Sequence, residues 1–194
     1  MDRRPLALLA LVALLPACSK SPAEPDKPSA PILAEPPVPP LLWDKPAAWT
    51  TLPAPPMSPT KATYRIDKAG NDKAEAEVNV FSLGTGDKGD PEKNFKEWFG
   101  QFDGDAASIA KRERFEAHGL PVETVAVSGT YKVPLGPPGP NKKPAMQMVK
   151  SGYRLYGAVV KTKDRGNWFF KLVGPEDTVQ AASSAFLRML ESAH

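Results

Sequence analysis

Apolar and polar residues alternate along stretches between residues 60 and 175, with the period of two that is typical of half-buried β-strands. The pattern is clearest in residues 62–66 and 76–80, where an apolar side chain occupies every second position. Residues 69–72, which include glycine and asparagine, lie between these two stretches and predict a turn. The two stretches are therefore predicted to form a β-hairpin.

Four later stretches also have strand character. Alternation returns in residues 112–118, and the apolar side chains of residues 125–133 fall on one strand face. Residues 153–161 are apolar on both sides, and a tight turn at 164–167 leads into another strand at 168–173. Because short turns separate most neighbouring strands, we expect them to pair mostly antiparallel.

The segment after residue 89 has the spacing of an amphipathic helix. Asp90 is predicted to be its N-cap, and Pro91 suits the first helical position. Its buried face is predicted to consist of four aromatic residues spaced three and four apart: Phe95, Trp98, Phe99 and Phe102. On the opposite face, Glu92 and Lys96 have the i, i+4 spacing of a favourable ion pair.

A second helix is predicted at the C-terminal end of the chain. Pro175 suits its first position, and the acidic residues that follow suit the positive end of the helix dipole. Its buried stripe is predicted to be Val179, Ala182, Phe186 and Leu190. The element order is then ββ-α-ββ-ββ-α, which predicts an α+β sandwich whose mostly antiparallel sheet is covered by two main helices.

The C-terminal part of this pattern resembles a known superfamily. Three consecutive features are similar to PsbP-like domains, which include the Mog-type factors. They are the aromatic strand Trp168-Phe169-Phe170-Lys171-Leu172-Val173, the Gly-Pro that follows it, and a helix with Phe186 and Met189. Trp49-Thr50-Thr51-Leu52-Pro53 fits the start of such a domain. The resemblance is closest to uncharacterised bacterial lipoproteins of this group. It implies six or seven antiparallel strands over residues 49–194 and a non-catalytic binding or assembly role.

An apolar run of ten residues, 6–15, follows a short basic start at the N-terminus. This run is too short to span a bilayer, which needs about 20 residues, but it has the length of a signal-peptide core. It ends in Leu15-Pro16-Ala17-Cys18, which resembles a bacterial lipobox. The resemblance implies removal of residues 1–17 and acylation of Cys18, with palmitate as a typical acyl chain. The alternative is a secreted protein with a chance cysteine near its cleavage site.

This resemblance also implies a location. A lipidated protein is held at the cell envelope, and Ser19 after the acylated cysteine favours the outer membrane if the cell has two membranes. The membrane itself is then the first expected partner, reached through the N-terminal lipid.

Residues 18–48 separate the acylated cysteine from the domain and contain nine prolines. Proline lacks an amide donor and fixes φ, so the segment favours extended polyproline II and acts as a spacer. Thirty such residues would reach roughly 90 Å. The alternative is a ligand for proline-binding modules, centred on residues 36–40. Trp43 and Trp49 are predicted to mark where the chain docks onto the domain.

Composition excludes several kinds of chemistry. A net charge of +3 is too small to indicate nucleic-acid binding, and a single cysteine permits neither an internal disulfide nor a cysteine-rich zinc site. The glycine-rich residues 84–89 lack the ending of a phosphate loop. His118 is predicted to be a surface residue beside a turn. Four aspartates lack calcium-loop spacing: Asp87, Asp90, Asp103 and Asp105. We therefore predict no enzyme activity, no cofactor and no metal site.

Residues 134–150 are predicted to form a long loop, which is a frequent location of function. Three lysines give it positive charge: Lys142, Lys143 and Lys150. They suggest contact with an acidic partner or with lipid headgroups; the alternative is a solvated insertion. The sequence thus predicts a lipid-anchored envelope protein that binds or stabilises an envelope protein. The alternative function is a small-molecule binding module that uses a groove between sheet and helix.

Overall fold

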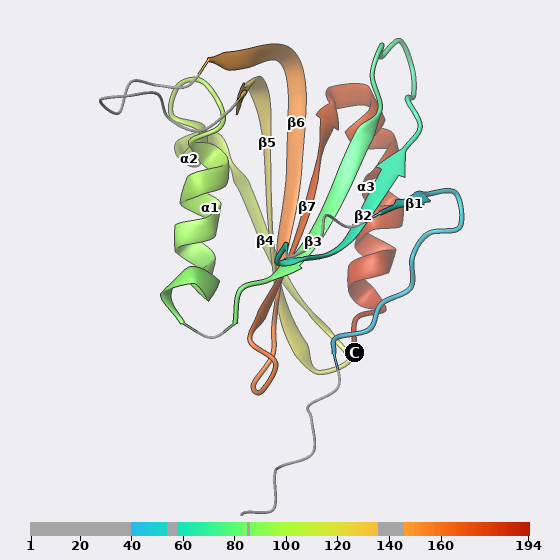
Figure 1. Cartoon of the computed structure of the whole chain (residues 1–194), viewed down its shortest axis with the longest axis vertical. Coiled ribbons are helices and arrows are strands. Elements are labelled where there is room, and N and C mark those ends of the chain that lie inside the picture. The colour runs from blue at the N-terminus through green and yellow to red at the C-terminus, as the bar shows by residue number, and fades with distance from the viewer. Residues whose placement is uncertain (1–39, 54–57, 85, 136–145) are drawn as a thin grey trace, which may run out of the picture. The chain divides into compact units, whose positions relative to one another are not determined.

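The computed structural model describes residues 40–53, 58–84, 86–135 and 146–194. Seven strands in these ranges form one antiparallel sheet in the order β1-β2-β3-β7-β6-β5-β4 (Figure 1). The strands are β1 (Thr50–Leu52), β2 (Thr60–Ile66), β3 (Ala76–Ser82), β4 (Lys111–Ala117), β5 (Leu120–Pro134), β6 (Gln147–Lys161) and β7 (Asn167–Pro175). The predicted hairpin of residues 62–66 and 76–80 is confirmed as the β2–β3 pair.

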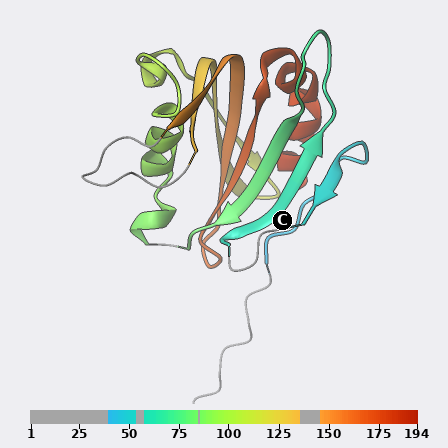
Figure 2. The same ribbon diagram turned by 45° about the horizontal axis from the view of Figure 1, so that its top comes forward.

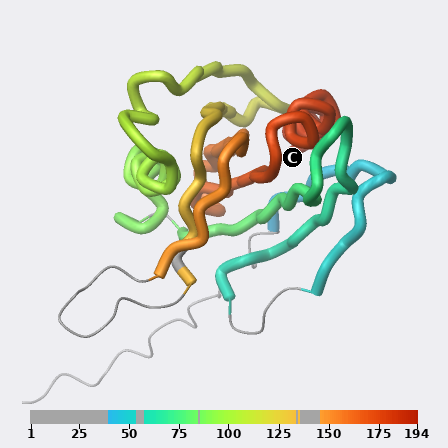
Figure 3. Tube along the Cα trace, turned by 90° about the horizontal axis from the view of Figure 1, so that it is seen from above, coloured from blue at the N-terminus to red at the C-terminus, as the bar shows by residue number. Residues whose placement is uncertain are grey.

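Helices cover both faces of this sheet. Helix α1 (Pro91–Phe99) and the short α2 (Ala106–Ile109) lie on one face, and α3 (Glu176–Glu191) lies on the other (Figures 1 and 3). The 3-10 turn η1 (Asp87–Gly89) precedes α1. The predicted α+β class, the antiparallel sheet and the two main helices are confirmed. The short elements β1, η1 and α2 had no prediction.

Local signals set the helix starts. The Asp90 side chain accepts a hydrogen bond of 2.8 Å from the backbone N–H of Lys93, and Pro91 follows it, so this predicted cap is confirmed. Helix α3 begins at Glu176, with Pro175 at the cap position. The prediction that Pro175 is the first helical residue was therefore wrong by one position, because β7 extends as far as Pro175.

Two apolar cores lie on opposite sides of the sheet. The core beneath α3 contains the whole predicted stripe of that helix, with Phe186 and Leu190 fully buried. The core beneath α1 contains Phe95, Trp98 and Phe99. Phe102 lies beyond the end of α1 but is buried in the same core, where it forms an isolated bridge with Tyr131.

The β5–β6 hairpin is longer than the sequence predicts. Its ladder continues outward through the pairs Tyr131–Lys150 and Val133–Met148, and the backbone N–H of Leu135 donates to the carbonyl of Met146 at 2.7 Å. The loop predicted over 134–150 is thus shorter than expected, with β5 ending at Pro134 and β6 beginning at Gln147, because these cross-strand hydrogen bonds satisfy backbone groups that a loop would leave to water. Residues 136–145 lie outside the described residues.

The chain packs onto the domain from Leu41 onward. The backbones of Leu42 and His194 exchange two hydrogen bonds, of 3.0 and 3.1 Å, and Leu41 is buried. The ring of Trp43 packs against Phe170, with centroids 5.4 Å apart, and its Nε1 donates to the Tyr64 hydroxyl at 2.9 Å. Figure 2 shows this segment beside the C-terminus. Residues 41–48, predicted as part of the spacer, therefore lie against the domain.

Candidate functional site

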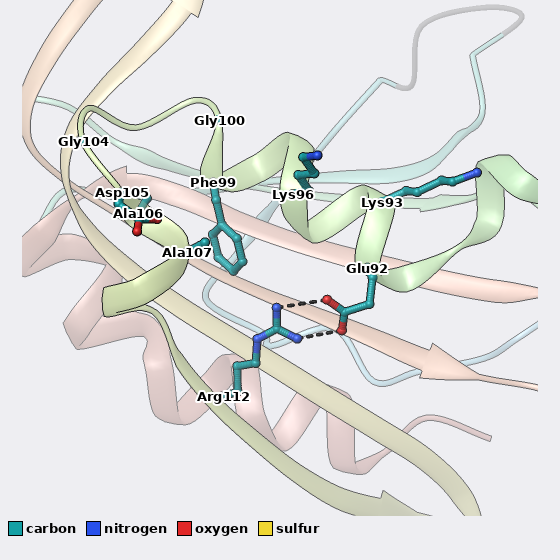
Figure 4. A pocket seen from close by; sticks show the side chains of 10 residues that line it. All are labelled: Glu92, Lys93, Lys96, Phe99, Gly100, Gly104, Asp105, Ala106, Ala107 and Arg112. Atoms are coloured by element: carbon teal, nitrogen blue, oxygen red, sulfur yellow. Dashed lines mark hydrogen bonds and ion pairs between the residues drawn. The ribbon is translucent and has the colours of Figure 1, made fainter.

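A groove of about 540 Å³ lies between α1, α2 and the edge strand β4 (Figure 4). Four kinds of side chain line it: apolar ones from both helices, two lysines of α1, a carboxylate–guanidinium pair that joins α1 to β4, and the carboxylate of Asp105. The lining residues are Glu92, Lys93, Lys96, Phe99, Gly100, Gly104, Asp105, Ala106, Ala107 and Arg112.

The carboxylate–guanidinium pair forms one wall of the groove. Two guanidinium nitrogens of Arg112 donate to the two carboxylate oxygens of Glu92, at 2.6 and 3.1 Å. The guanidinium also lies over the rings of Phe95 and Phe99, 5.5 and 5.8 Å from their centroids. Hydrogen bonding to Glu92 raises the pKa of Arg112. Planar, bidentate pairing of this kind holds both side chains in fixed positions.

The predicted pair of Glu92 with Lys96 is replaced by this contact. Both oxygens of Glu92 are occupied by Arg112, which lies twenty residues away in sequence. The i, i+4 spacing offers a weak pair in water, whereas the bidentate guanidinium supplies two aligned donors. Lys96 is left on the exposed surface at the rim of the groove.

A buried carboxylate continues the charge network behind the groove. The side chain of Glu123 is only 4% exposed, and it pairs with Arg114 and Lys161 at 3.2 Å and with Arg112 at 3.6 Å. Burial by itself would raise the pKa of Glu123, but the hydrogen bonds from Arg114 and Lys161 outweigh it and hold that pKa below its ordinary value. Glu123, on β5, thereby links side chains of β4 and β6.

A second polar cluster lies beyond the C-terminal end of α1. The ammonium of Lys171 donates to Oε1 of Gln101 at 2.6 Å, and the Tyr131 hydroxyl donates to the same oxygen at 3.0 Å. Burial lowers the pKa of Lys171 to about 8, opposed in part by the charge of Glu77. Burial likewise raises the pKa of Tyr131 to about 12. Both shifts disfavour the charged forms, as expected of groups removed from water.

The lining of the groove is suited to binding. Phe99 and the alanines of α2 offer apolar contact, while Lys93 and Lys96 offer charge at the rim. The lining residues include no histidine, cysteine or serine. Over the described ranges, no group of three or more His, Cys, Asp or Glu side chains is placed to hold a metal ion.

The four aspartates considered as calcium ligands have separate roles. Asp90 caps α1, and Asp105 accepts from the backbone N–H of Ser108 at the start of α2. Asp87 pairs with Lys93 at 3.2 Å, and Asp103 pairs with Lys132. Each of these carboxylates thus has a nitrogen partner, and Asp87 and Asp90 share Lys93.

The sequence also singled out Cys18, His118 and three lysines. Cys18, Lys142 and Lys143 lie outside the described residues. Lys150 lies on β6, with its Nζ 5.0 Å from the centroid of the Tyr153 ring. His118 is exposed in the β4–β5 turn, where its φ of 48° is left-handed. Of these residues, the described Lys150 and His118 lie on different elements and do not form one site.

Sequence reasoning missed the network of Glu123, although a signal was present. Val125 and Val127 are predicted to face inward, and alternation places Glu123 on the same face. A charged residue at an inward position requires a partner. The identity of that partner is set by the neighbouring strands β4 and β6, which the local sequence does not show.

No protein-family model matches the chain, and no curated protein matches it. Among solved structures, it is similar to the solution structure of cyanobacterial PsbP (CyanoP) from Synechocystis sp. PCC 6803. The TM-score is 0.44 and the sequence identity is 16%. The match covers 79% of this chain and 85% of that chain. A similarity of this size does not indicate what this chain binds.

None of the helices among the described residues is long and apolar enough to cross a membrane.

Proposed function

We propose that this protein is a lipid-anchored protein of the cell envelope whose domain binds a protein partner, without catalysis, through the groove between α1, α2 and β4. The observation that carries the binding role is the groove itself, with its apolar centre and charged rim. Protein interfaces have the same anatomy, in which a desolvated apolar centre is surrounded by polar groups.

A neighbouring exposed residue supports a protein as the occupant. Ile109, at the end of α2, is 65% exposed, and Ala107 beside it lines the groove. A large apolar side chain at the edge of an open groove extends the apolar area beyond what a small ligand would cover. The pairing of Glu92 with Arg112 already satisfies both charges, so the wall of the groove requires no charged ligand.

The anchor is supported by the sequence. The lipobox-like residues Leu15-Pro16-Ala17-Cys18 follow an apolar run, and Cys18 is the sole cysteine of the chain. Packing onto the domain begins at Leu41. If the intervening segment is extended, it spans roughly 70 Å, which allows the domain to reach a partner away from the membrane surface.

The volume of the groove favours a second candidate function, small-molecule binding. Ligand pockets for small molecules are typically about 300–1,000 Å³, and this groove has about 540 Å³. Lys96 would then favour anionic groups, because Lys93 already pairs with Asp87.

Replacing the proposed acylated residue tests the anchor. We expect the unaltered protein to fractionate with membranes and to carry acyl mass on its N-terminal peptide, because acyl chains supply the membrane affinity. Cys18→Ser should abolish both. The matched control is Cys18→Ser combined with Ser21→Cys, which keeps one cysteine but moves it away from the lipobox. Membrane association of Cys18→Ser with unchanged mass would refute the anchor.

Site-specific photo-crosslinking tests the groove. A photo-reactive residue at Ala107 should give one discrete crosslinked protein in intact cells, because Ala107 lines the groove and is exposed. The same residue at Ser184, exposed on α3, is the control and should give none. If Ala107 gives no product while a defined metabolite raises the melting temperature by several degrees, the small-molecule function is the correct one. If neither occurs, the groove has no binding role.

A further inference from the structure

The β5–β6 hairpin is the most strongly basic part of the chain. Residues 124–163 contain seven Lys and Arg residues and no Asp or Glu, while the rest of the chain has 18 Lys and Arg against 22 Asp and Glu. The modest overall charge therefore conceals a strong local asymmetry. Such asymmetry creates a positive potential that attracts anionic surfaces.

Acidic residues elsewhere in the fold neutralise four of these positive charges only in part: three of them have an acidic neighbour, and one does not. Near the body of the sheet, Lys161 pairs with Glu123 and Arg154 lies 3.9 Å from Glu176. Lys132 pairs with Asp103. Lys150 has no acidic partner within the described residues, and its ammonium lies over the Tyr153 ring. Toward the outer end, Lys132 is thus compensated by Asp103, whereas Lys150 is not.

The same outer end exposes apolar side chains. On one face of the hairpin, Tyr131 lies in the core and is 8% exposed. Val133 and Met148 lie further out on this face, and Leu135 and Met146 form the outermost described pair. Met148 is 40% exposed, Leu135 57% and Met146 80%. On the other face, Val149 is 58% exposed. We name residues 131–135 and 146–150 the hairpin tip.

We propose that the hairpin tip binds the surface of an anionic phospholipid bilayer. Apolar side chains flanked by lysines match the two layers of such a surface, since the headgroups carry negative charge and the acyl chains begin beneath them. An acidic protein would satisfy the charge but would not require apolar residues exposed on both faces of a two-stranded tip. The proposal rests on the lipid anchor, which keeps the domain close to a membrane.

A spacer in the extended form would allow the tip to reach the bilayer. In Figure 1 the described chain begins at the lower end of the sheet, beside the C-terminus, and the tip lies at the opposite, upper end. A domain of this size is roughly 40 Å across. The roughly 70 Å available to an extended spacer exceeds that distance, so the domain can turn its tip toward the membrane that holds Cys18.

Flotation with vesicles tests this proposal on residues 19–194, which contain every described residue of the domain but lack Cys18. We expect binding to phosphatidylcholine vesicles with about one third phosphatidylglycerol, and at least ~10-fold weaker binding to phosphatidylcholine alone. Leu135→Ser with Met146→Ser should reduce binding roughly 10-fold, and Lys150→Glu should reduce it at least ~5-fold.

Matched controls remove equivalent groups elsewhere. Leu42→Ser with Ile109→Ser removes two similarly exposed apolar side chains, and Lys111→Glu reverses a charge on exposed β4. Both should bind vesicles as the unaltered protein does, and circular dichroism should show all variants folded. Absence of vesicle binding, or binding that the tip variants do not weaken, would overturn the proposal. Binding that soluble polyglutamate removes and that is unaffected by the serine variants would also overturn it, in favour of an acidic protein. Because Cys18 is absent throughout, these outcomes are independent of whether the anchor is acylated.

Discussion

Gly157→Ala is expected to destabilise the domain by about 3 kcal/mol. Gly157 lies on β6 beneath the ring of Trp98 from α1. A Cβ at this position would overlap Cζ3 of that ring and lie 2.7 Å from Cε3. Trp98 is 4% exposed and packs against Phe95 and Phe169, so its ring has no free space to move into. Urea unfolding followed by tryptophan fluorescence measures the loss.

Gly129→Ala is the matched control for this overlap. Gly129 lies on the adjacent strand β5, and a Cβ there would meet Phe102 at 3.6 Å, an ordinary contact. We expect a change below about 0.5 kcal/mol. Trp98→Phe should relieve the overlap. The double variant with Gly157→Ala should therefore lose less stability than the two single variants lose together. Equal losses for both glycine variants would show that close approach of α1 is not the cause.

Lys171 is expected to make stability rise with pH between about 8 and 10. Its pKa is about 8 in the folded protein, below its ordinary value of about 10.4 in the unfolded chain. In this range the unfolded chain holds a proton that the folded protein has released, so raising the pH favours folding. Lys171→Met removes this contribution. The free energy of unfolding of Lys171→Met, minus that of the unaltered protein, should therefore be about 2 kcal/mol higher at pH 7 than at pH 10.

Urea unfolding at a series of pH values from 7 to 10 tests this linkage. The upper limit avoids Tyr131, whose pKa of about 12 in the folded protein makes stability fall above about pH 10. The control is Lys163→Met, at an exposed position in the β6–β7 turn. Its stability should change with pH as that of the unaltered protein does. If the stability of Lys171→Met also changes with pH as that of the unaltered protein does, then Lys171 remains protonated to high pH and the burial argument for it fails.

The predictions that succeeded rest on neighbours in sequence. The cap formed by Asp90 needs only the backbone N–H of Lys93, three residues on. The buried stripe of α3 follows from a spacing of three and four residues within one helix. The β2–β3 hairpin needs a turn and two alternating strands, all within about twenty residues.

The predictions that failed depend on distant contacts. Glu92 was expected to pair with Lys96 but binds Arg112, because β4 crosses beneath α1. The outer end of the β5–β6 hairpin was expected to be a loop, since its proline- and glycine-rich centre hides how far the ladder extends. In both cases the hydrogen-bond partners lie on another element: Arg112 on β4 for Glu92, and the opposite strand for the ends of β5 and β6.

The sequence by itself determined the class of fold, the start of α1 and the faces that the strands bury, because hydrophobic period and capping act within a few residues. It also located the lipobox-like motif and the basic, acid-free stretch of residues 124–163. Only the tertiary structure decided that α1, α2 and β4 enclose a groove and that Lys171 meets Gln101 and Tyr131. These sites depend on which elements pack together, and packing joins residues that are 20 to 70 positions apart.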